Sequence, residues 1–153
     1  MANSDVRFVY TDDNGMVIIV CPADKTDKTL DEIKAQNCPD NKTVYTVEPS
    51  KCPTDRSFRD AWSFDGTNFG VNITKAREIH KENIRSARTE KLAELDIEFQ
   101  KAQETSADTS AIVAKKNALR DAPADSAIDA ATDEAGLKAQ WNTSILGTSP
   151  YAS

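Results

Sequence analysis

The chain has 153 residues, 39% of them hydrophobic and 29% charged, and its formal net charge is −6. This negative balance argues against a nucleic-acid partner, because binding to phosphates requires clustered Lys and Arg. The longest apolar run, residues 16–21, is too short to span a membrane. The first residues lack the basic and apolar segments of a secretion signal, so we expect a protein kept in the cytoplasm with no membrane partner.

Two β-prone runs open the chain. Residues 6–10 and 16–21 are rich in β-branched and aromatic side chains. Between them lies Asn14-Gly15, and both of these residue types tolerate the positive φ that a tight hairpin turn requires. Pro22 ends the second run, because proline cannot donate to a strand ladder. The pattern predicts an antiparallel hairpin.

A short helix and a third strand are expected next. Thr29 is a suitable N-cap, and Glu32 three positions later completes a capping box. The helix has to end before Pro39, since the residue preceding a proline avoids the helical conformation. Residues 43–47 then alternate as a strand does, and Pro49 ends them.

A second small hairpin is predicted at residues 62–64 and 69–71, around Asp65-Gly66. We therefore interpret residues 1–71 as a small β-rich subdomain, an antiparallel meander that carries one short helix.

The remainder, residues 72–153, is helical in pattern. Residues 75–104 contain neither Gly nor Pro. Within them, six residues recur at steps of three and four, which places them on one narrow stripe of the helix. The members of the stripe are Ile84, Arg88, Leu92, Leu95, Phe99 and Ala102.

A second helix, ending at Asp121, is predicted to follow a short turn, which makes the two helices antiparallel neighbours. A last short helix is expected to begin near Thr132 and to carry Leu137 and Trp141 on one side. Residues 147–153 form a tail without an element of its own. The sequence thus predicts an α+β fold in which a helical hairpin, a short helix and a tail follow the β meander.

Each of the three cysteines precedes a proline: Cys21, Cys38 and Cys52. Their spacing matches no Cys-x-x-Cys metal or redox motif. One interpretation is that they are small, semi-buried side chains at the ends of elements. The other is one intramolecular disulfide with an odd thiol left for another chain, which would form only after release into an oxidising medium.

The sequence gives little support for a catalytic site. His80, the only histidine, lies inside a predicted helix without a nearby nucleophile, so we interpret it as a packing or exposed residue. The five glycines are scattered singly, and none forms a phosphate-binding loop. We therefore expect no enzyme, no cofactor and no metal site.

Phe58, Arg59 and Trp62 lie at the junction between the two halves. Arg and Trp are enriched at the energetic centres of protein interfaces. Phe58 and Trp62 are spaced to share one face of a helical turn, so they could also plug the junction. We predict that these three residues, together with Trp141, bind a partner.

Several pieces of the chain, in their order, resemble small proteins encoded by tailed bacteriophages and prophages close to tail-fibre genes, namely tail-fibre assembly chaperones and minor tail components. The proteins of this group carry no fixed cysteines before these prolines, so the three cysteines are particular to this chain. The pieces are residues 6–11, 14–15 and 17–22, Asp-Arg-Ser-Phe-Arg-Asp-Ala-Trp at 55–62, residues 75–79, 92–96 and 118–121, Leu137 and Trp141.

The resemblance implies a chaperone or co-folding factor that binds the tail fibre or baseplate protein of the same phage. Such a protein would act in the host cytoplasm during assembly, and retention in the virion tail is compatible with it. The alternative is a permanent structural subunit of the tail or baseplate whose cysteines link it to other chains.

Overall fold

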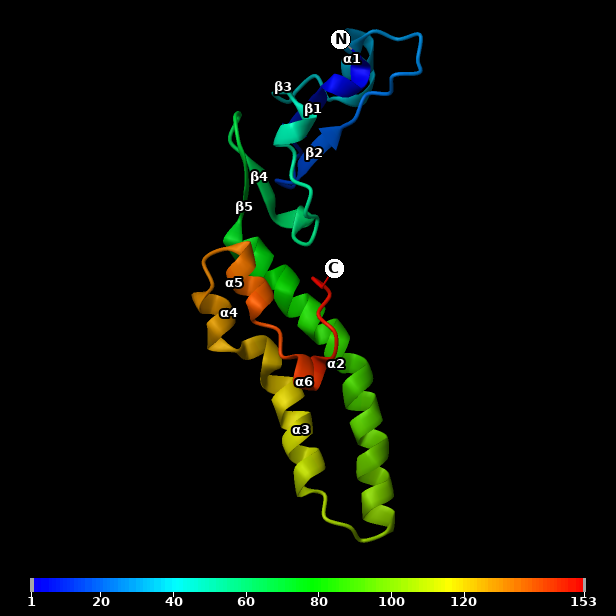
Figure 1. The fold of residues 1–153 in the computed structure, drawn as a ribbon, viewed down its shortest axis with the longest axis vertical. Helices are drawn as coiled ribbons and strands as arrows, with labels where there is room; N and C mark the ends of the chain where they lie inside the picture. The colour runs from blue at the N-terminus through cyan, green and yellow to red at the C-terminus, as the bar shows by residue number, and fades with distance from the viewer. Residues whose placement is uncertain (1, 153) are drawn as a thin grey trace. The chain divides into compact units, whose positions relative to one another are not determined.

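The computed structural model describes residues 2–152 and has the α+β architecture that the sequence predicts (Figure 1). A small antiparallel β region comes first, and one long helix and several short helices follow. The chain divides into two compact units between Asn72 and Ile73. Each unit is described in turn below.

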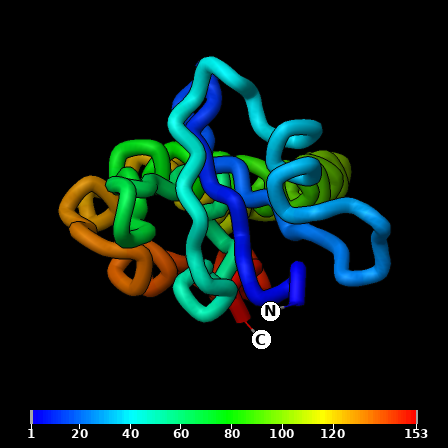
Figure 2. The backbone as a smooth tube through the Cα atoms, turned by 90° about the horizontal axis from the view of Figure 1, so that it is seen from above, coloured from blue at the N-terminus to red at the C-terminus, as the bar shows by residue number. Residues whose placement is uncertain are grey.

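Three strands form the main sheet of the first unit: β1 (Arg7–Thr11), β2 (Val17–Val20) and β3 (Tyr45–Val47). The strand order is β2-β1-β3, and both pairings are antiparallel. β3 therefore pairs with β1 and not with β2, so the order differs from that of a simple meander. Figure 2 shows the β3 segment running beside β1.

The sheet is covered on both faces, because alternate residues of β1 point to opposite sides. On one face, α1 (Leu30–Asn37) contributes to a first apolar cluster. On the other face, Trp62 contributes to a second cluster. The first cluster contains Val6, Phe8, Ile33 and Cys38, and the second contains Val9, Val17 and Trp62.

Local hydrogen bonds explain why the predicted turns form. Oδ1 of Asp12 accepts the backbone N–H groups of Asn14 and Met16, each at 2.9 Å. Gly15 takes a φ of 79°, which L side chains rarely adopt. The predicted hairpin of β1 and β2 is therefore confirmed, with its turn closed by an aspartate as well as by Asn-Gly.

The predicted capping box of α1 is also confirmed. Oγ1 of Thr29 accepts the N–H of Glu32, and the Glu32 carboxylate accepts the N–H of Thr29. The helix ends at Asn37, just before Cys38 and Pro39, as expected.

The second predicted hairpin consists of β4 (Trp62–Phe64) and β5 (Phe69–Val71). Asp65 accepts N–H groups from Thr67 and Asn68, and Gly66 takes a φ of 99°. These strands form a separate two-stranded sheet.

The second unit is built on α2 (Ile73–Glu104), and α3 (Ser110–Asp121) returns antiparallel beside it (Figure 1). The predicted helical hairpin is confirmed. The expected last helix is α5 (Glu134–Ala139), and Trp141 lies beyond its end. Two short helices were not predicted, α4 (Ser126–Ala130) and α6 (Thr143–Leu146). Each begins at a side-chain N-cap and has only five or four residues, which is too short for a helical spacing to be recognised.

The apolar core of this unit is thin. Of the 32 residues of α2, only Ala76, His80, Ile84 and Leu95 are buried. The four shorter helices contribute one buried residue each, namely Leu119, Ile128, Leu137 and Leu146.

Candidate functional site

Two arginines of α2 reach backbone carbonyl groups at the ends of neighbouring helices. Arg77 Nη2 donates to the carbonyl oxygen of Ala131, the C-cap of α4, at 2.8 Å. Arg88 Nη1 donates to the carbonyls of Leu119 and Arg120, in the last turn of α3, at 3.3 and 2.8 Å. The last carbonyls of a helix have no partner within the helix and attract positive charge. Both arginines therefore stabilise helix C-termini.

His80 likewise stabilises the C-terminus of α5, and it also binds Tyr151 of the C-terminal segment. Its Nε2 lies 2.9 Å from the carbonyl oxygen of Gln140, the C-cap of α5, and its Nδ1 lies 2.6 Å from Tyr151 Oη. A carbonyl can only accept, so Nε2 carries the proton and Nδ1 accepts from the tyrosine hydroxyl. Asn83 Nδ2 donates to the same hydroxyl oxygen at 3.1 Å.

Aromatic rings complete this cluster. The His80 ring stacks on Tyr151 with 5.6 Å between centroids and 17° between planes. Trp141 meets the His80 ring edge to face at 6.2 Å, and its Nε1 donates to the carbonyl of Gly147 at 3.0 Å. We call His80, Asn83, Trp141 and Tyr151 the histidine cluster.

Both titratable members of the histidine cluster are held in their neutral forms. Burial lowers the pKa of His80, and the hydrogen bond to the Gln140 carbonyl opposes this shift only in part. Burial raises the pKa of Tyr151, against the effect of the Asn83 hydrogen bond. A neutral imidazole and a neutral phenol satisfy each other in this geometry.

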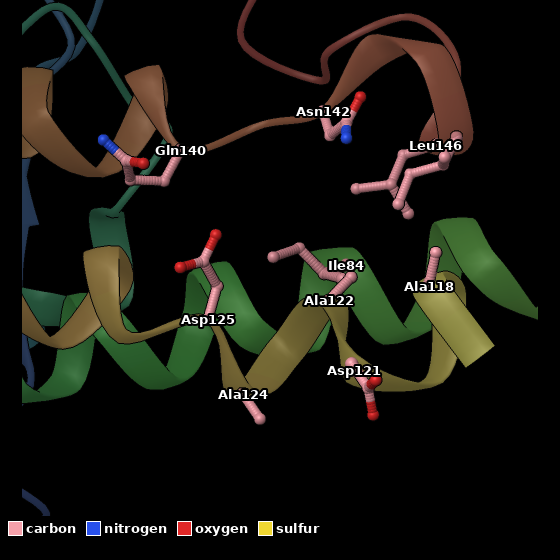
Figure 3. Close-up of a pocket in the computed structure, with 10 residues that line it drawn as sticks. Ile84, Ala118, Asp121, Ala122, Ala124, Asp125, Gln140, Asn142 and Leu146 are labelled. Carbon is pink, nitrogen blue, oxygen red and sulfur yellow. The ribbon is translucent and has the colours of Figure 1, made fainter. Parts of the chain in front are cut away.

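One hollow of the helical unit has a volume of about 520 Å³. Ile84 and Leu146 point toward it from α2 and α6, whereas Asp121 points away (Figure 3). Asp125 and Asn142 at its border already accept backbone N–H groups as helix N-caps. These two side chains are therefore committed to the fold.

A smaller groove of about 200 Å³ lies between α2, α3 and α6. Its apolar residues are Leu95, Leu119 and Ile145, and charged residues of both signs surround them. We call this feature the hairpin groove. It has room for one large apolar side chain. Its charged residues are Lys91, Glu94, Glu98 and Lys115.

The predicted partner-binding residues differ in how deeply they are buried. Phe58 and Trp62 are only 1% and 4% exposed, so both side chains pack in the core, and their binding to a partner stays a prediction. The reason is that Trp62 begins β4 after a 3-10 turn at Arg59–Ala61 and packs against the main sheet. Arg59 is exposed, and Trp141 is half-buried in the histidine cluster.

The three cysteines are free thiols. Cys38 is buried in the first apolar cluster, whereas Cys21 is exposed and Cys52 is half-buried. Burial raises the pKa of Cys52, Arg7 opposes the shift, and the nearby Cys21 adds to it. Because Val20 pairs with Phe8, the next residue, Cys21, falls beside Arg7 at the end of the ladder. Cys21 and Cys52 are therefore neighbours around Arg7, and Cys38 belongs to the other face.

Sequence reasoning interpreted His80 as a packing or exposed residue, and the structure places it in the interior. Its partner Tyr151 was missed, because residues 147–153 were expected to be a plain tail. The available signals were an unpaired histidine with Asn83 on the same helix face and a tyrosine in an otherwise small and polar segment.

Within residues 2–152, no group of three His, Cys, Asp or Glu side chains is placed to hold a metal ion. Over the same residues, none of the helices combines the length and the apolar character needed to cross a bilayer. Comparison of the chain with protein-family models, curated proteins and solved structures finds no match. A functional assignment therefore depends on the chain's own residues.

Proposed function

We propose that this chain is an accessory protein of a phage tail, an assembly chaperone or co-folding factor that acts by binding the tail fibre. Its partner would be the fibre or baseplate protein of the same phage. Binding would take place in the host cytoplasm during assembly, and the virion tail would be its location if it is retained. The order of sequence pieces described above motivates the phage context, and the helical unit supports a binding role.

The main support is the incomplete burial of the helical hairpin. Ile97 and Val113 are 54% and 38% exposed, although both are large and apolar. Leu92, Phe99 and Ile112 are only half-buried along the same two helices. Covering such side chains is favourable by about 25 cal/mol per Å² of apolar surface. A partner that lies along the hairpin would therefore gain free energy from surface that the chain leaves open.

The hairpin groove is the best-formed place for an anchoring side chain. Leu95, Leu119 and Ile145 provide apolar contact, and the surrounding lysines and glutamates can pair with polar residues on either side of the anchor. A binding site of this type favours an amphipathic segment, in which one apolar residue enters the groove and its neighbours remain polar. An unassembled fibre strand with an apolar face has this character.

Co-expression with the tail-fibre protein tests the proposal. We expect this chain to raise the yield of soluble fibre trimer. Ser144 is exposed and lines the groove, so Ser144→Trp should fill the groove and remove most of the gain. Ala93→Trp is the matched control, because Ala93 is exposed on α2 and does not line the groove. An unchanged trimer yield with the wild-type chain would refute the chaperone proposal.

The exposed thiol of Cys21 favours one alternative, a permanent tail subunit with covalent links. In that case non-reducing gels of intact particles would show a band with the summed mass of fibre and this chain. Reduction or Cys21→Ser should then remove the band. A chaperone that leaves after assembly would give no such band and no copy of the chain in the particle.

A further inference from the structure

The segment from residue 147 to residue 152 contains no helix or strand, yet it is held against the helical unit. Tyr151 provides most of the attachment through its hydrogen bonds to His80 and Asn83. Trp141 adds a hydrogen bond to the carbonyl of Gly147, and Lys138 Nζ lies 5.8 Å from the centre of the Tyr151 ring. We call residues 147–152 the strap.

We propose that the strap is an acid-released device, closed while His80 is neutral and opened when His80 takes up a proton. The inference is independent of the proposed binding to a fibre. It follows from the hydrogen bonds of the histidine cluster, its burial and the charges around it.

The observed arrangement of donors and acceptors is that of the neutral state. Neutral His80 donates from Nε2 to the Gln140 carbonyl and accepts at Nδ1 from Tyr151. Protonation adds a hydrogen to Nδ1, so this nitrogen can no longer accept. The Tyr151 hydroxyl proton then has to leave His80, and its oxygen faces two donors, Nδ1–H and Asn83 Nδ2–H. Protonation therefore reverses the hydrogen bond seen in the structure and places a positive charge inside a buried cluster, which is costly unless the strap opens and water reaches the ring.

The surroundings oppose a positive charge on His80. The ring is fully buried, and the hydrogen bonds described for it are made to uncharged groups. From α5, the positively charged Lys138 Nζ lies 5.8 Å from the centre of the Tyr151 ring. On α2, Arg77 bonds the Ala131 carbonyl, and Lys81 pairs with Glu78 and with Asp129 of α4.

The direction of the pH dependence follows from the lowered pKa of His80. With the strap open, the imidazole is hydrated and its pKa returns toward the ordinary value of about 6.5. The open form therefore binds more protons than the closed form below that pH. Closure is complete above about pH 6.5 and is lost as the pH falls toward the lower pKa of the closed form.

Release should be local. The bond from Nε2 to the Gln140 carbonyl needs a protonated Nε2, and this nitrogen is protonated in both charge states. The C-terminus of α5 therefore keeps its histidine cap while the strap loses the acceptor at Nδ1. Opening would expose the His80 ring and one side of Trp141 without unfolding the helices.

A titration of the full chain by NMR tests the inference, because His80 is the only histidine and its ring signals are unambiguous. We expect the Nε2-protonated tautomer at neutral pH. As the ring takes up its proton, the amide signals of Thr148, Ser149, Tyr151 and Ala152 should move to positions typical of an unstructured segment, and the Trp141 indole signal should move to that of an indole exposed to water. Amide signals of α2 and α5 should stay in place. Protonation without movement of the strap, or unfolding of the whole unit in the same step, would overturn the inference.

Three variants test whether opening of the strap depends on His80 or on a general sensitivity of the chain to acid. His80→Gln offers a donor and an acceptor at similar positions and does not titrate, so its strap should stay closed through the same pH range. Tyr151→Phe should open the strap at neutral pH, with amide exchange in residues 148–152 roughly tenfold faster. Asp129→Asn removes a nearby ion pair and should leave the midpoint unchanged. Opening of the His80→Gln strap at the wild-type midpoint would contradict the role of His80.

Discussion

The two units reach a defined structure by different routes. The β-rich unit places apolar side chains on both faces of a three-stranded sheet and closes its turns with nearby aspartates. The helical unit has a thin apolar core, and α2 compensates with polar side chains that bond carbonyls 31 to 60 residues away. Where apolar residues are scarce, satisfying the ends of short helices becomes a major source of tertiary specificity.

The two units also differ in how completely they bury their large apolar residues. The β-rich unit buries three of its aromatic residues, Phe8, Phe58 and Trp62, and leaves Tyr45 37% exposed, whereas the hairpin leaves Ile97 54% exposed. We therefore expect core changes to dominate in the first unit and helix-end contacts to matter in the second. The following predictions test this contrast.

The largest effect is expected from truncation of buried side chains. Phe8→Ala should lower the free energy of unfolding by about 3–5 kcal/mol, and Leu137→Ala should lower it by about 2–5 kcal/mol, because each leaves a cavity. Denaturant unfolding, monitored by amide hydrogen exchange in each unit, measures both changes in the free energy of unfolding. Val113→Ala is the exposed control and should cost less than about 0.5 kcal/mol. A loss of similar size for Leu137→Ala and Val113→Ala would show that the helical core contributes almost nothing.

The second effect concerns the cysteines of the β-rich unit. Treatment with oxidised glutathione should link Cys21 to Cys52, converting two thiols to one disulfide and releasing two molecules of reduced glutathione. The reason is that both thiols lie near Arg7, while Cys38 is buried on the other face. The link should add about 2–4 kcal/mol of stability.

Peptide mapping by mass spectrometry without reduction checks the pairing. Cys38→Ala should leave it intact, and Cys21→Ser should abolish it. A Cys21–Cys38 or Cys38–Cys52 link would contradict the placement of the thiols on the sheet.

The third effect tests the capping role of α2. Arg88→Met keeps the aliphatic part of the side chain but removes both bonds to the end of α3, so it should cost about 1.5–3 kcal/mol. Arg85→Met removes only an exposed pair with Glu82 and should cost about 0.3–0.5 kcal/mol. Thermal unfolding of the two variants side by side measures the difference, and equal losses would mean that the carbonyl contacts add nothing.

The smallest effect is expected at the N-cap of α1. Thr29→Ala removes one half of the capping box and should cost about 1 kcal/mol. Thr43→Ala is the control, because Thr43 is exposed and lies outside the helix. Amide exchange at Ile33 should quicken in the first variant only. A neutral Thr29→Ala would show that sheet packing alone holds α1 in place.

The sequence predicts well whatever depends on contacts within about four residues. The hairpin turn at Asn14-Gly15, the capping box of α1 and the antiparallel pair α2 and α3 all follow from residues close along the chain. Such elements are encoded by turn residues, caps and apolar spacing.

Other features depend on neighbours that the sequence does not reveal. The pairing of β3 with β1, the burial of Phe58 and Trp62, and the bond between His80 and Tyr151 join residues far apart in the chain. Amino-acid spacing alone therefore determined the class of fold and most of its elements, because local hydrogen bonds and periodicity act over a few residues. The tertiary structure decided which face each aromatic residue covers and turned a lone histidine into the anchor of the strap, since packing and desolvation arise only when distant segments meet.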